Sequence, residues 1–265
     1  RPKRRGCSGV YRFVPLIVAN DVEHHVQMLG QGPPVVMAHG LITGSLATWF
    51  YTTAPALAQT HQVMLYDLRG HGRSARTTTG YDTDTLVDDL MALTHSITEP
   101  ITLVGHSYGA LIALKYALKF PEKVARLVLV ETPLPPSKMS EFTKFLQQTP
   151  ETMIDALPDA MQSLFRSQQG SRRTRRLLEA LNFLVSKCSL LSDLMAETDL
   201  TNEELGSIQC DVLAIHGTES SLRSVGTRLA SQIKHCSAVE LPGGHYLPME
   251  ASKELTDTIV GYCCG

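Results

Sequence analysis

A serine between two glycines, in the pentapeptide Gly105-His106-Ser107-Tyr108-Gly109, is the residue of this sequence best suited to covalent chemistry. It directly follows the apolar run 101–104 and precedes a helix-like stretch, residues 110–120, that Pro121 closes. A sharp strand-to-helix turn lifts a serine hydroxyl clear of the backbone and aims the first N–H groups of the helix at developing negative charge. The pattern predicts that Ser107 is a nucleophile. The alternative is a turn whose serine only caps the helix.

A histidine near the C-terminus is the best candidate for the base, which a serine needs at neutral pH. His245 lies in the loop Gly243-Gly244-His245-Tyr246, directly after an expected strand at 238–241. The alternative is a loop histidine bonded to backbone. His216 falls at a strand end and is expected to support the fold. The other histidines are expected in turn motifs (His39, His71 and His106) or at the surface (His24, His25, His61, His95 and His235).

Two backbone N–H groups are expected to bind the negative oxygen that forms when a carbonyl is attacked. Such donors are required in acyl transfer. Tyr108 follows the predicted nucleophile, so its N–H is the first candidate. The second is expected from a loop after an earlier strand. The segment His39-Gly40-Leu41 fits this position, and we assign the donor to the N–H of Leu41.

Four motifs, taken in order along the chain, resemble the α/β-hydrolase superfamily. They are His39-Gly40, the segment 67–74 (Asp-Leu-Arg-Gly-His-Gly-Arg-Ser), the pentapeptide 105–109, and Gly244-His245-x-x-Pro248-x-Glu250. The resemblance covers nearly the whole chain. It implies a mostly parallel sheet flanked by helices and the chain order nucleophile, acid, histidine. It also implies a structural role for the loop 67–74, to which we assign no chemistry.

The acid is the point at which this sequence departs from the family pattern. Most relatives place an aspartate just beyond the strand that corresponds to 212–215, but Gly217-Thr218-Glu219-Ser220 has a serine there. A serine cannot supply the charge that stabilises an imidazolium. We assign the acid to Glu131, which ends the expected strand 127–130, because some family branches carry their acid on that strand end. Glu219 is the alternative acid, and the absence of a true acid stays open.

Short apolar runs alternate with helical patterns in most of the chain, which predicts an α/β fold with a parallel sheet covered on both faces. The expected strands are 35–38, 62–66, 101–104, 127–130, 212–215 and 238–241. Ahead of them, residues 10–18 and 23–29 are expected to form an antiparallel hairpin across Asn20-Asp21.

A long segment without strand signals interrupts this alternation. It predicts a helical cap at 132–209 over the edge of the sheet where such folds bind ligands, inserted into a core formed by 1–131 and 210–265. A helical layer packed only for stability is the alternative. Four arginines within 172–176 are interpreted as a solvated face, with docking of an acidic substrate handle or a carrier protein as the alternative. Apolar residues at helical spacing are expected to line the substrate entrance: Phe142, Phe145, Leu146, Leu181 and Leu184.

Composition excludes several classes of partner. The length of 265 residues suits one large α/β domain or one domain with an insertion, and 43% hydrophobic and 19% charged residues are ordinary for a globular protein. A net charge of −2 leaves no footprint for nucleic acid, and no apolar run could span a membrane. Six cysteines without paired spacing favour reduced thiols in a cytoplasmic protein. We expect no metal and no cofactor. The oligomeric state is not predicted.

The residues together predict a cofactor-free serine hydrolase that acts on an ester, thioester or lactone, a small molecule with an apolar part. Carbon–carbon hydrolysis, as in the meta-cleavage product hydrolases, uses the same constellation. One alternative is a non-hydrolytic member of the fold, either a cofactor-free dioxygenase or a lyase. Another is a receptor-like protein that binds a ligand with little turnover.

Overall fold

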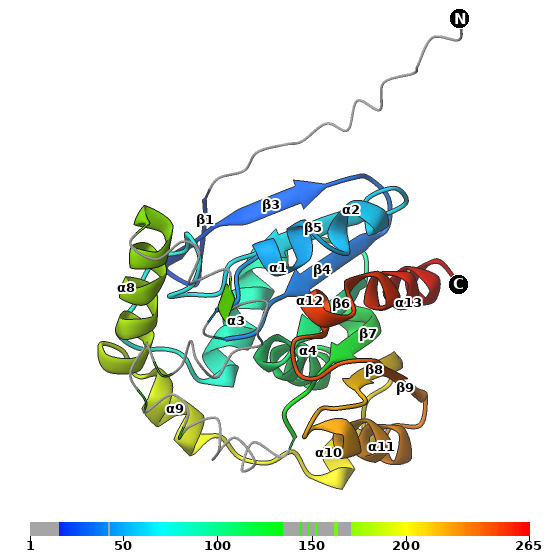
Figure 1. Ribbon diagram of the computed structural model, residues 1–265. Helices are drawn as coiled ribbons and strands as arrows, with labels where there is room; N and C mark the ends of the chain where they lie inside the picture. Colours follow the sequence, from blue (N-terminus) through cyan, green and yellow to red (C-terminus); the bar gives the residue numbers. More distant parts are fainter. Residues whose placement is uncertain are drawn as a thin grey trace, which may run out of the picture.

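The centre of the molecule is a seven-stranded sheet with the order β3-β5-β4-β6-β7-β8-β9 (Figure 1). The computed structural model describes residues 16–41, 43–134 and 171–265, with residues 144, 148, 152, 162 and 163. All pairings in the sheet are parallel except that of β3 with β5. The predicted α/β fold with a mostly parallel sheet is therefore confirmed. The strands are β3 (Val26–Leu29), β4 (Pro34–Ala38), β5 (Gln62–Tyr66), β6 (Ile101–His106), β7 (Val124–Val130), β8 (Asp211–Gly217) and β9 (Cys236–Leu241).

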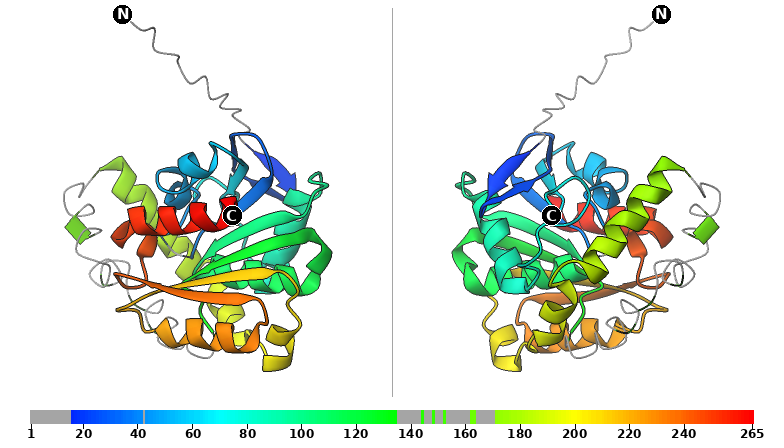
Figure 2. Two further views of the ribbon diagram at one scale, coloured as in Figure 1. Left: turned by 90° about the vertical axis from the view of Figure 1, so that its right-hand side faces the viewer. Right: turned by 90° about the vertical axis from the view of Figure 1, so that its left-hand side faces the viewer.

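Helices cover both faces of the sheet. Successive residues along a strand point to opposite faces, so each strand can contribute to two separate buried clusters. In β4, Val36 and Ala38 belong to one buried cluster, and Val35 and Met37 belong to the other. The first cluster includes residues of α3 (Thr83–Thr94), α4 (Tyr108–Lys119) and α11 (Arg223–Gln232). The second includes residues of α1 (Ala47–Phe50), α2 (Ala54–Leu57), α12 (Leu247–Glu250) and α13 (Ser252–Cys264). Both views of Figure 2 show α11, in orange, below β8 and β9 at one end of the sheet.

The predicted N-terminal hairpin is present in a shorter form. Strands β1 (Ile17–Ala19) and β2 (Val22–His24) pair antiparallel, and the two turn residues, Asn20 and Asp21, have φ of 49° and 60°. Asparagine and aspartate tolerate these angles, which a two-residue hairpin requires. The expected second arm, 23–29, was too long, because its later part is β3, which joins the main sheet. Residues 10–15 lie outside the described residues.

Part of the predicted cap is described as three helices, α8 (Arg172–Ser186), α9 (Leu190–Ala196) and α10 (Asn202–Gly206). Figure 1 shows α8 and α9 together along the left of the molecule. Leu184 of α8 lies against Gly70, in the loop after β5, and Glu197 at the end of α9 pairs with Lys115 of α4 at 2.8 Å. These contacts support a cap over the sheet edge. Its boundaries stay a prediction, because most of 135–170 lies outside the described residues.

Three histidines that we expected at the surface are buried, so that part of the prediction is wrong. His24, His25 and His61 are 0%, 6% and 7% exposed. For His24 and His25, the reason is a buried cluster of polar side chains whose members lie far apart in the sequence. The ring of His25 contacts Asp67 at 2.8 Å, and the ring of His24 lies 3.7 Å from Asp89.

The loop 67–74 has the structural role that the family resemblance implied. The carboxylate of Asp67 accepts hydrogen bonds from the backbone N–H groups of Leu46 at 2.7 Å and Arg73 at 2.9 Å. One side chain thus joins the loops that follow β4 and β5. Within the described residues, no helix is long and apolar enough to cross a membrane.

Candidate active site

Ser107 lies at a strained turn between β6 and α4. Its φ of 53° and ψ of −122° belong to a region that non-glycine residues rarely adopt. Such strain persists where the surroundings fix it. Here the N–H of Ser107 donates to the carbonyl of Val130 in β7 at 2.8 Å. A side-chain carbon at Gly109 would lie 2.6 Å from the carbonyl oxygen of His39, so the tight turn requires glycine there.

The ring of His245 joins the two other predicted residues. Its Nε2 lies 3.0 Å from Oγ of Ser107, and its Nδ1 lies 3.1 Å from Oε2 of Glu131. When Nδ1–H donates to the carboxylate, Nε2 keeps the lone pair that faces the serine hydroxyl. This arrangement meets the geometric requirement for a nucleophile, a base and a group that orients the base.

Glu131 is held at the end of β7 with its carboxylate fully buried. Its φ is 55°, and its N–H donates to the carbonyl of Ile215 in β8 at 2.9 Å. Oε1 accepts the N–H of Gly217 at 2.6 Å, and Oε2 accepts the hydroxyl of Ser220 at 2.5 Å. Burial raises the pKa of Glu131, but hydrogen bonds from the His245 ring, Ser220 and the backbone outweigh it. The net pKa lies below its ordinary value, so the carboxylate is charged at neutral pH.

Glu219, the alternative acid, is exposed on the turn after β8. Its backbone N–H donates to the carbonyl of Gly243 at 3.0 Å. Among the described contacts, the ring nitrogens of His245 meet Glu131 and Ser107, and none involves the carboxylate of Glu219. The geometry therefore favours Glu131, and the assignment of either residue as the catalytic acid stays a prediction.

The segment after β4 lies directly beside the serine. A side-chain carbon at Gly40 would be 3.1 Å from Cβ of Ser107. The buried ring of His39 fixes this segment, because its Nε2 accepts the N–H of Leu68 at 3.0 Å and its Nδ1–H donates to the carbonyl of Gly40 at 2.7 Å. Leu41 follows Gly40 directly in the chain. This placement supports its N–H as a donor to the oxyanion.

Tyr108 supplies the other expected donor. It is the first residue of α4, so its N–H has no acceptor within the helix. The helix begins directly at the predicted nucleophile, which places this N–H at the positive end of the helix dipole. The oxyanion roles of Leu41 and Tyr108 stay predictions.

Two residues near the site received no chemical role from the sequence. His106 is buried and its Nε2 lies 2.9 Å from the carbonyl of His245, so a neutral ring there anchors the histidine loop. Burial, followed by the nearby His245, lowers the pKa of His106 to about 3 and keeps it neutral. Ser220 contacts the carboxylate of Glu131. Ser220 holds the position at which most relatives carry the acid, and this position could have indicated from the sequence that Ser220 lies near the His245 ring.

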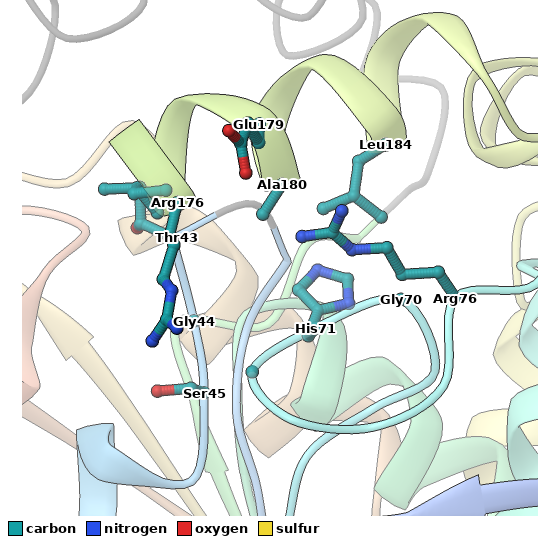
Figure 3. A pocket seen from close by; sticks show the side chains of 12 residues that line it. Thr43, Gly44, Ser45, Gly70, His71, Arg76, Arg176, Glu179, Ala180 and Leu184 are labelled. Atoms are coloured by element: carbon teal, nitrogen blue, oxygen red, sulfur yellow. The ribbon is translucent and has the colours of Figure 1, made fainter. Parts of the chain in front are cut away.

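A cavity of about 460 Å³ lies between α8 and the loops that follow β4 and β5 (Figure 3). Leu184 lines this cavity, as expected for the substrate entrance. Leu181 is 1% exposed within the hydrophobic core and does not line this cavity. Phe142, Phe145 and Leu146 lie outside the described residues. The full lining is Thr43, Gly44, Ser45, Gly70, His71, Gly72, Arg76, Arg176, Leu177, Glu179, Ala180 and Leu184.

The chain is similar to several known proteins. Over 239 residues, the chain is 29% identical to the pimeloyl-(acyl-carrier protein) methyl ester esterase of Chromobacterium violaceum, covering 84% of this chain and 91% of that protein. Over 108 residues, it is 41% identical to the cis-3-alkyl-4-alkyloxetan-2-one decarboxylase of Shewanella oneidensis, which covers 39% of this chain and only 33% of that protein.

A solved structure and a family profile also match this chain. The structure of the enol-lactonase from Burkholderia xenovorans LB400 matches with a TM-score of 0.74 at 21% identity, covering 95% of this chain and all of that one. The profile of the alpha/beta hydrolase fold matches residues 33–210. Because this match spans most of the chain, the chain belongs to the alpha/beta hydrolase fold family and is an α/β-fold hydrolase, as its motifs predicted.

Proposed function

We propose that this chain is a cofactor-free serine hydrolase that cleaves an ester, thioester or lactone with an apolar part. The observation that carries the proposal is the continuous hydrogen-bonded series from Ser107 through His245 to Glu131, with distances of 3.0 and 3.1 Å. The series has the order nucleophile, base and orienting acid that acyl transfer requires.

In the first half-reaction, Oγ of Ser107 attacks the substrate carbonyl while Nε2 of His245 accepts the hydroxyl proton. The charge of Glu131 stabilises the imidazolium that results. The N–H groups of Leu41 and Tyr108 donate to the oxyanion. As the tetrahedral intermediate collapses, the bond to the leaving group breaks. His245 returns its proton to the departing oxygen or sulfur, and the acyl group stays on Ser107.

In the second half-reaction, the same histidine activates water. Nε2 of His245 removes a proton from the water as the oxygen attacks the acyl carbonyl. Collapse of the second intermediate breaks the bond to Oγ, and the proton on His245 returns to Ser107. The carboxylic acid product leaves, and the reaction consumes only the substrate and one water molecule.

The proposed substrate is a small molecule with an apolar acyl or alcohol part. Leu177, Ala180 and Leu184 of α8 give the cavity an apolar side. The named activity of the Chromobacterium violaceum relative is on a methyl ester, which supports an ester as the substrate. The cap that covers this cavity, and the cytoplasmic location expected from the cysteines, stay predictions.

A panel of p-nitrophenyl esters with graded chain lengths tests the proposal. The wild-type chain is expected to hydrolyse at least one ester, and Ser107→Ala to lose roughly 10³-fold or more of kcat, as in nucleophile deletions. Activity of Ser107→Ala within a few-fold of wild type would contradict the serine mechanism and favour the dioxygenase-type alternative. A meta-cleavage product assayed beside the panel separates ester from carbon–carbon hydrolysis. Tight ligand retention without turnover would favour the receptor-like protein.

A further inference from the structure

Ser220 occupies the place where most relatives carry the catalytic acid, and its hydroxyl meets the acid that this chain carries elsewhere. The Ser220 N–H donates to the carbonyl of Gly217 at 3.1 Å, which closes a tight turn after β8. Its Oγ donates to Oε2 of Glu131 at 2.5 Å. The N–H of Leu222 donates to the same Oγ at 3.0 Å.

These contacts fix the direction of the serine proton. The N–H of Leu222 donates to the Ser220 hydroxyl, and the charged carboxylate of Glu131 can only accept, so the hydroxyl proton is directed to Glu131. The buried carboxylate then has a donor on each oxygen besides the ring of His245, one from Gly217 and one from Ser220. A group that orients a catalytic ring must itself be held.

We propose that Ser220 is a positioning residue for Glu131. Its hydroxyl holds Oε2 of the carboxylate, and Oε2 in turn lies 3.1 Å from Nδ1 of His245. This inference rests on the proposed serine mechanism.

The first test replaces Ser220. Ser220→Ala is expected to lower kcat about 10-fold with KM within about 2-fold, because one charge-stabilising hydrogen bond is lost. Ser220→Thr, which keeps the hydroxyl, is expected to restore most of kcat. Thr218→Ala, on the same turn and exposed, is the control and is expected to match wild type. If Ser220→Ala keeps the wild-type kcat, or if the threonine restores nothing in a folded protein, the positioning role is wrong.

The second test combines two variants. Glu131→Ala alone is expected to lose roughly 10²- to 10⁴-fold of kcat, the scale of triad-acid replacements. Because Ser220 acts through Glu131, adding Ser220→Ala to Glu131→Ala is expected to cause no further loss of kcat. A further loss of about 10-fold in a folded double variant would overturn the positioning role. These outcomes differ from failure of the serine mechanism, which would appear as a fully active Ser107→Ala.

A separate observation concerns charge in the cavity between α8 and the loops that follow β4 and β5. Figure 3 shows Arg176 extending from α8 towards Gly44 and Ser45, while the guanidinium of Arg76 lies beside His71 and Leu184. Both arginines are exposed, and neither takes part in an ion pair among the described contacts. The guanidinium of Arg76 lies 5.6 Å from the ring centroid of Phe183, which holds it against α8.

The cavity has an excess of positive charge. Burial, and then the nearby His39, lower the pKa of His71 to about 3, so this ring is neutral. Glu179 is the one carboxylate in the described lining, against two guanidinium groups. The hydroxyls of Thr43 and Ser45 and the apolar side chains of α8 complete a wall suited to a short chain with an anionic end.

The segment after β4 contributes both to this cavity, through Thr43, Gly44 and Ser45, and to the surroundings of Ser107, through Gly40. A side-chain carbon at Gly44 would collide with the carbonyl of Gly40, and Gly40 packs against Ser107. We propose that Arg76 and Arg176 bind a carboxylate or phosphate at the far end of the substrate while its carbonyl lies at Ser107. This second inference also rests on the proposed function, and it narrows the substrate to esters with an anionic end group.

Three esters of equal chain length test this subsite: p-nitrophenyl hexanoate, the mono-p-nitrophenyl ester of adipate, and p-nitrophenyl 6-phosphooxyhexanoate. We expect kcat/KM to be higher for the carboxylate or the phosphate ester than for the neutral ester. The anionic ester with the larger kcat/KM shows which anion the subsite prefers. Arg76→Gln and Arg176→Gln are each expected to cut the ratio of kcat/KM for the preferred anionic ester to kcat/KM for hexanoate about 10-fold. Arg175→Gln, an exposed arginine of α8 outside the cavity, is the control.

The outcomes separate this subsite from the reaction itself. Equal kcat/KM for all three esters, or a preference that both arginine variants retain, would overturn the subsite while leaving the hydrolase intact. Glu179→Gln is expected to strengthen the preference, because it removes the opposing charge. If no ester of the series is hydrolysed, the proposed function fails first.

Discussion

Replacing Glu131 by glutamine tests the assignment of the acid, because the structure indicates how the site would respond. All three groups around the wild-type carboxylate are donors, namely the N–H of Gly217, the hydroxyl of Ser220 and Nδ1–H of His245. Glutamine brings one acceptor oxygen and one NH₂ donor. In either orientation of the amide, its NH₂ group therefore faces a group that is itself a donor in the wild-type protein.

Either orientation of the glutamine is unfavourable. With NH₂ at the position of Oε1, two donors meet at Gly217 in a buried site, which costs about 1–3 kcal/mol. With NH₂ at the position of Oε2, the His245 ring must accept at Nδ1 and carry its proton on Nε2. A protonated Nε2 cannot accept the proton of Ser107. Loss of the charge also removes the stabilisation of the imidazolium in both cases.

We expect Glu131→Gln to lower kcat/KM by roughly 10²- to 10⁴-fold, as triad-acid replacements do. At 1.36 kcal/mol per tenfold change in rate, this corresponds to about 2.7–5.4 kcal/mol of transition-state stabilisation. The assay is hydrolysis of the best p-nitrophenyl ester of the panel, with the melting temperature recorded for each variant. Glu219→Gln is the matched control and is expected to stay within about a few-fold of wild type, as exposed sites do. The reverse ranking of the two variants would refute the assignment.

Four further predictions concern stability and selectivity. Leu184→Ala and Leu181→Ala, two equally buried leucines of α8, are each expected to cost about 2–5 kcal/mol in urea unfolding, but only Leu184→Ala should shift the preferred ester chain length. Gly109→Ala is expected to lower both stability and kcat, because its side chain would lie 2.6 Å from the His39 carbonyl; an unchanged melting temperature would contradict this. Arg69→Met leaves Asp89 without its partner in a buried ion pair and is expected to cost about 3–5 kcal/mol in unfolding experiments. The lowered pKa of Glu131 means that its charge stabilises the fold above its ordinary pKa of 4.5 and that this contribution is lost as pH falls through the folded pKa. The stability difference between wild type and Glu131→Gln should therefore be larger at pH 7 than at pH 3; a constant difference would contradict it.

The parallel strands and the serine turn could be predicted because their signals are local. Apolar runs such as 101–104 and 127–130 are strands in the structure, and glycine at position 109 is required by a close backbone approach. The motif order also placed His245 correctly after a strand. These features depend on periodicity and on short-range sterics, which a single sequence carries.

The buried polar contacts could not be predicted because their partners are far apart in the chain. Nothing near His24 and His25 indicates that Asp67 and Asp89 will lie against their rings. For the same reason, the choice between Glu131 and Glu219 needed the fold. Glu131 reaches the His245 ring from the end of β7, whereas Glu219 is exposed on a turn. Which carboxylate reaches the His245 ring depends on the tertiary structure.

Covalent labelling of Ser107 tests the central claim most directly. The wild-type chain is incubated with a fluorophosphonate, its intact mass is measured, and the modified residue is located by peptide mapping. A serine activated by the His245 ring should give one adduct per chain, on Ser107, and the adduct should be absent from Ser107→Ala and slow to form in His245→Ala. An ester-hydrolysing chain that stays unlabelled, or one that is labelled at another serine, would contradict the account.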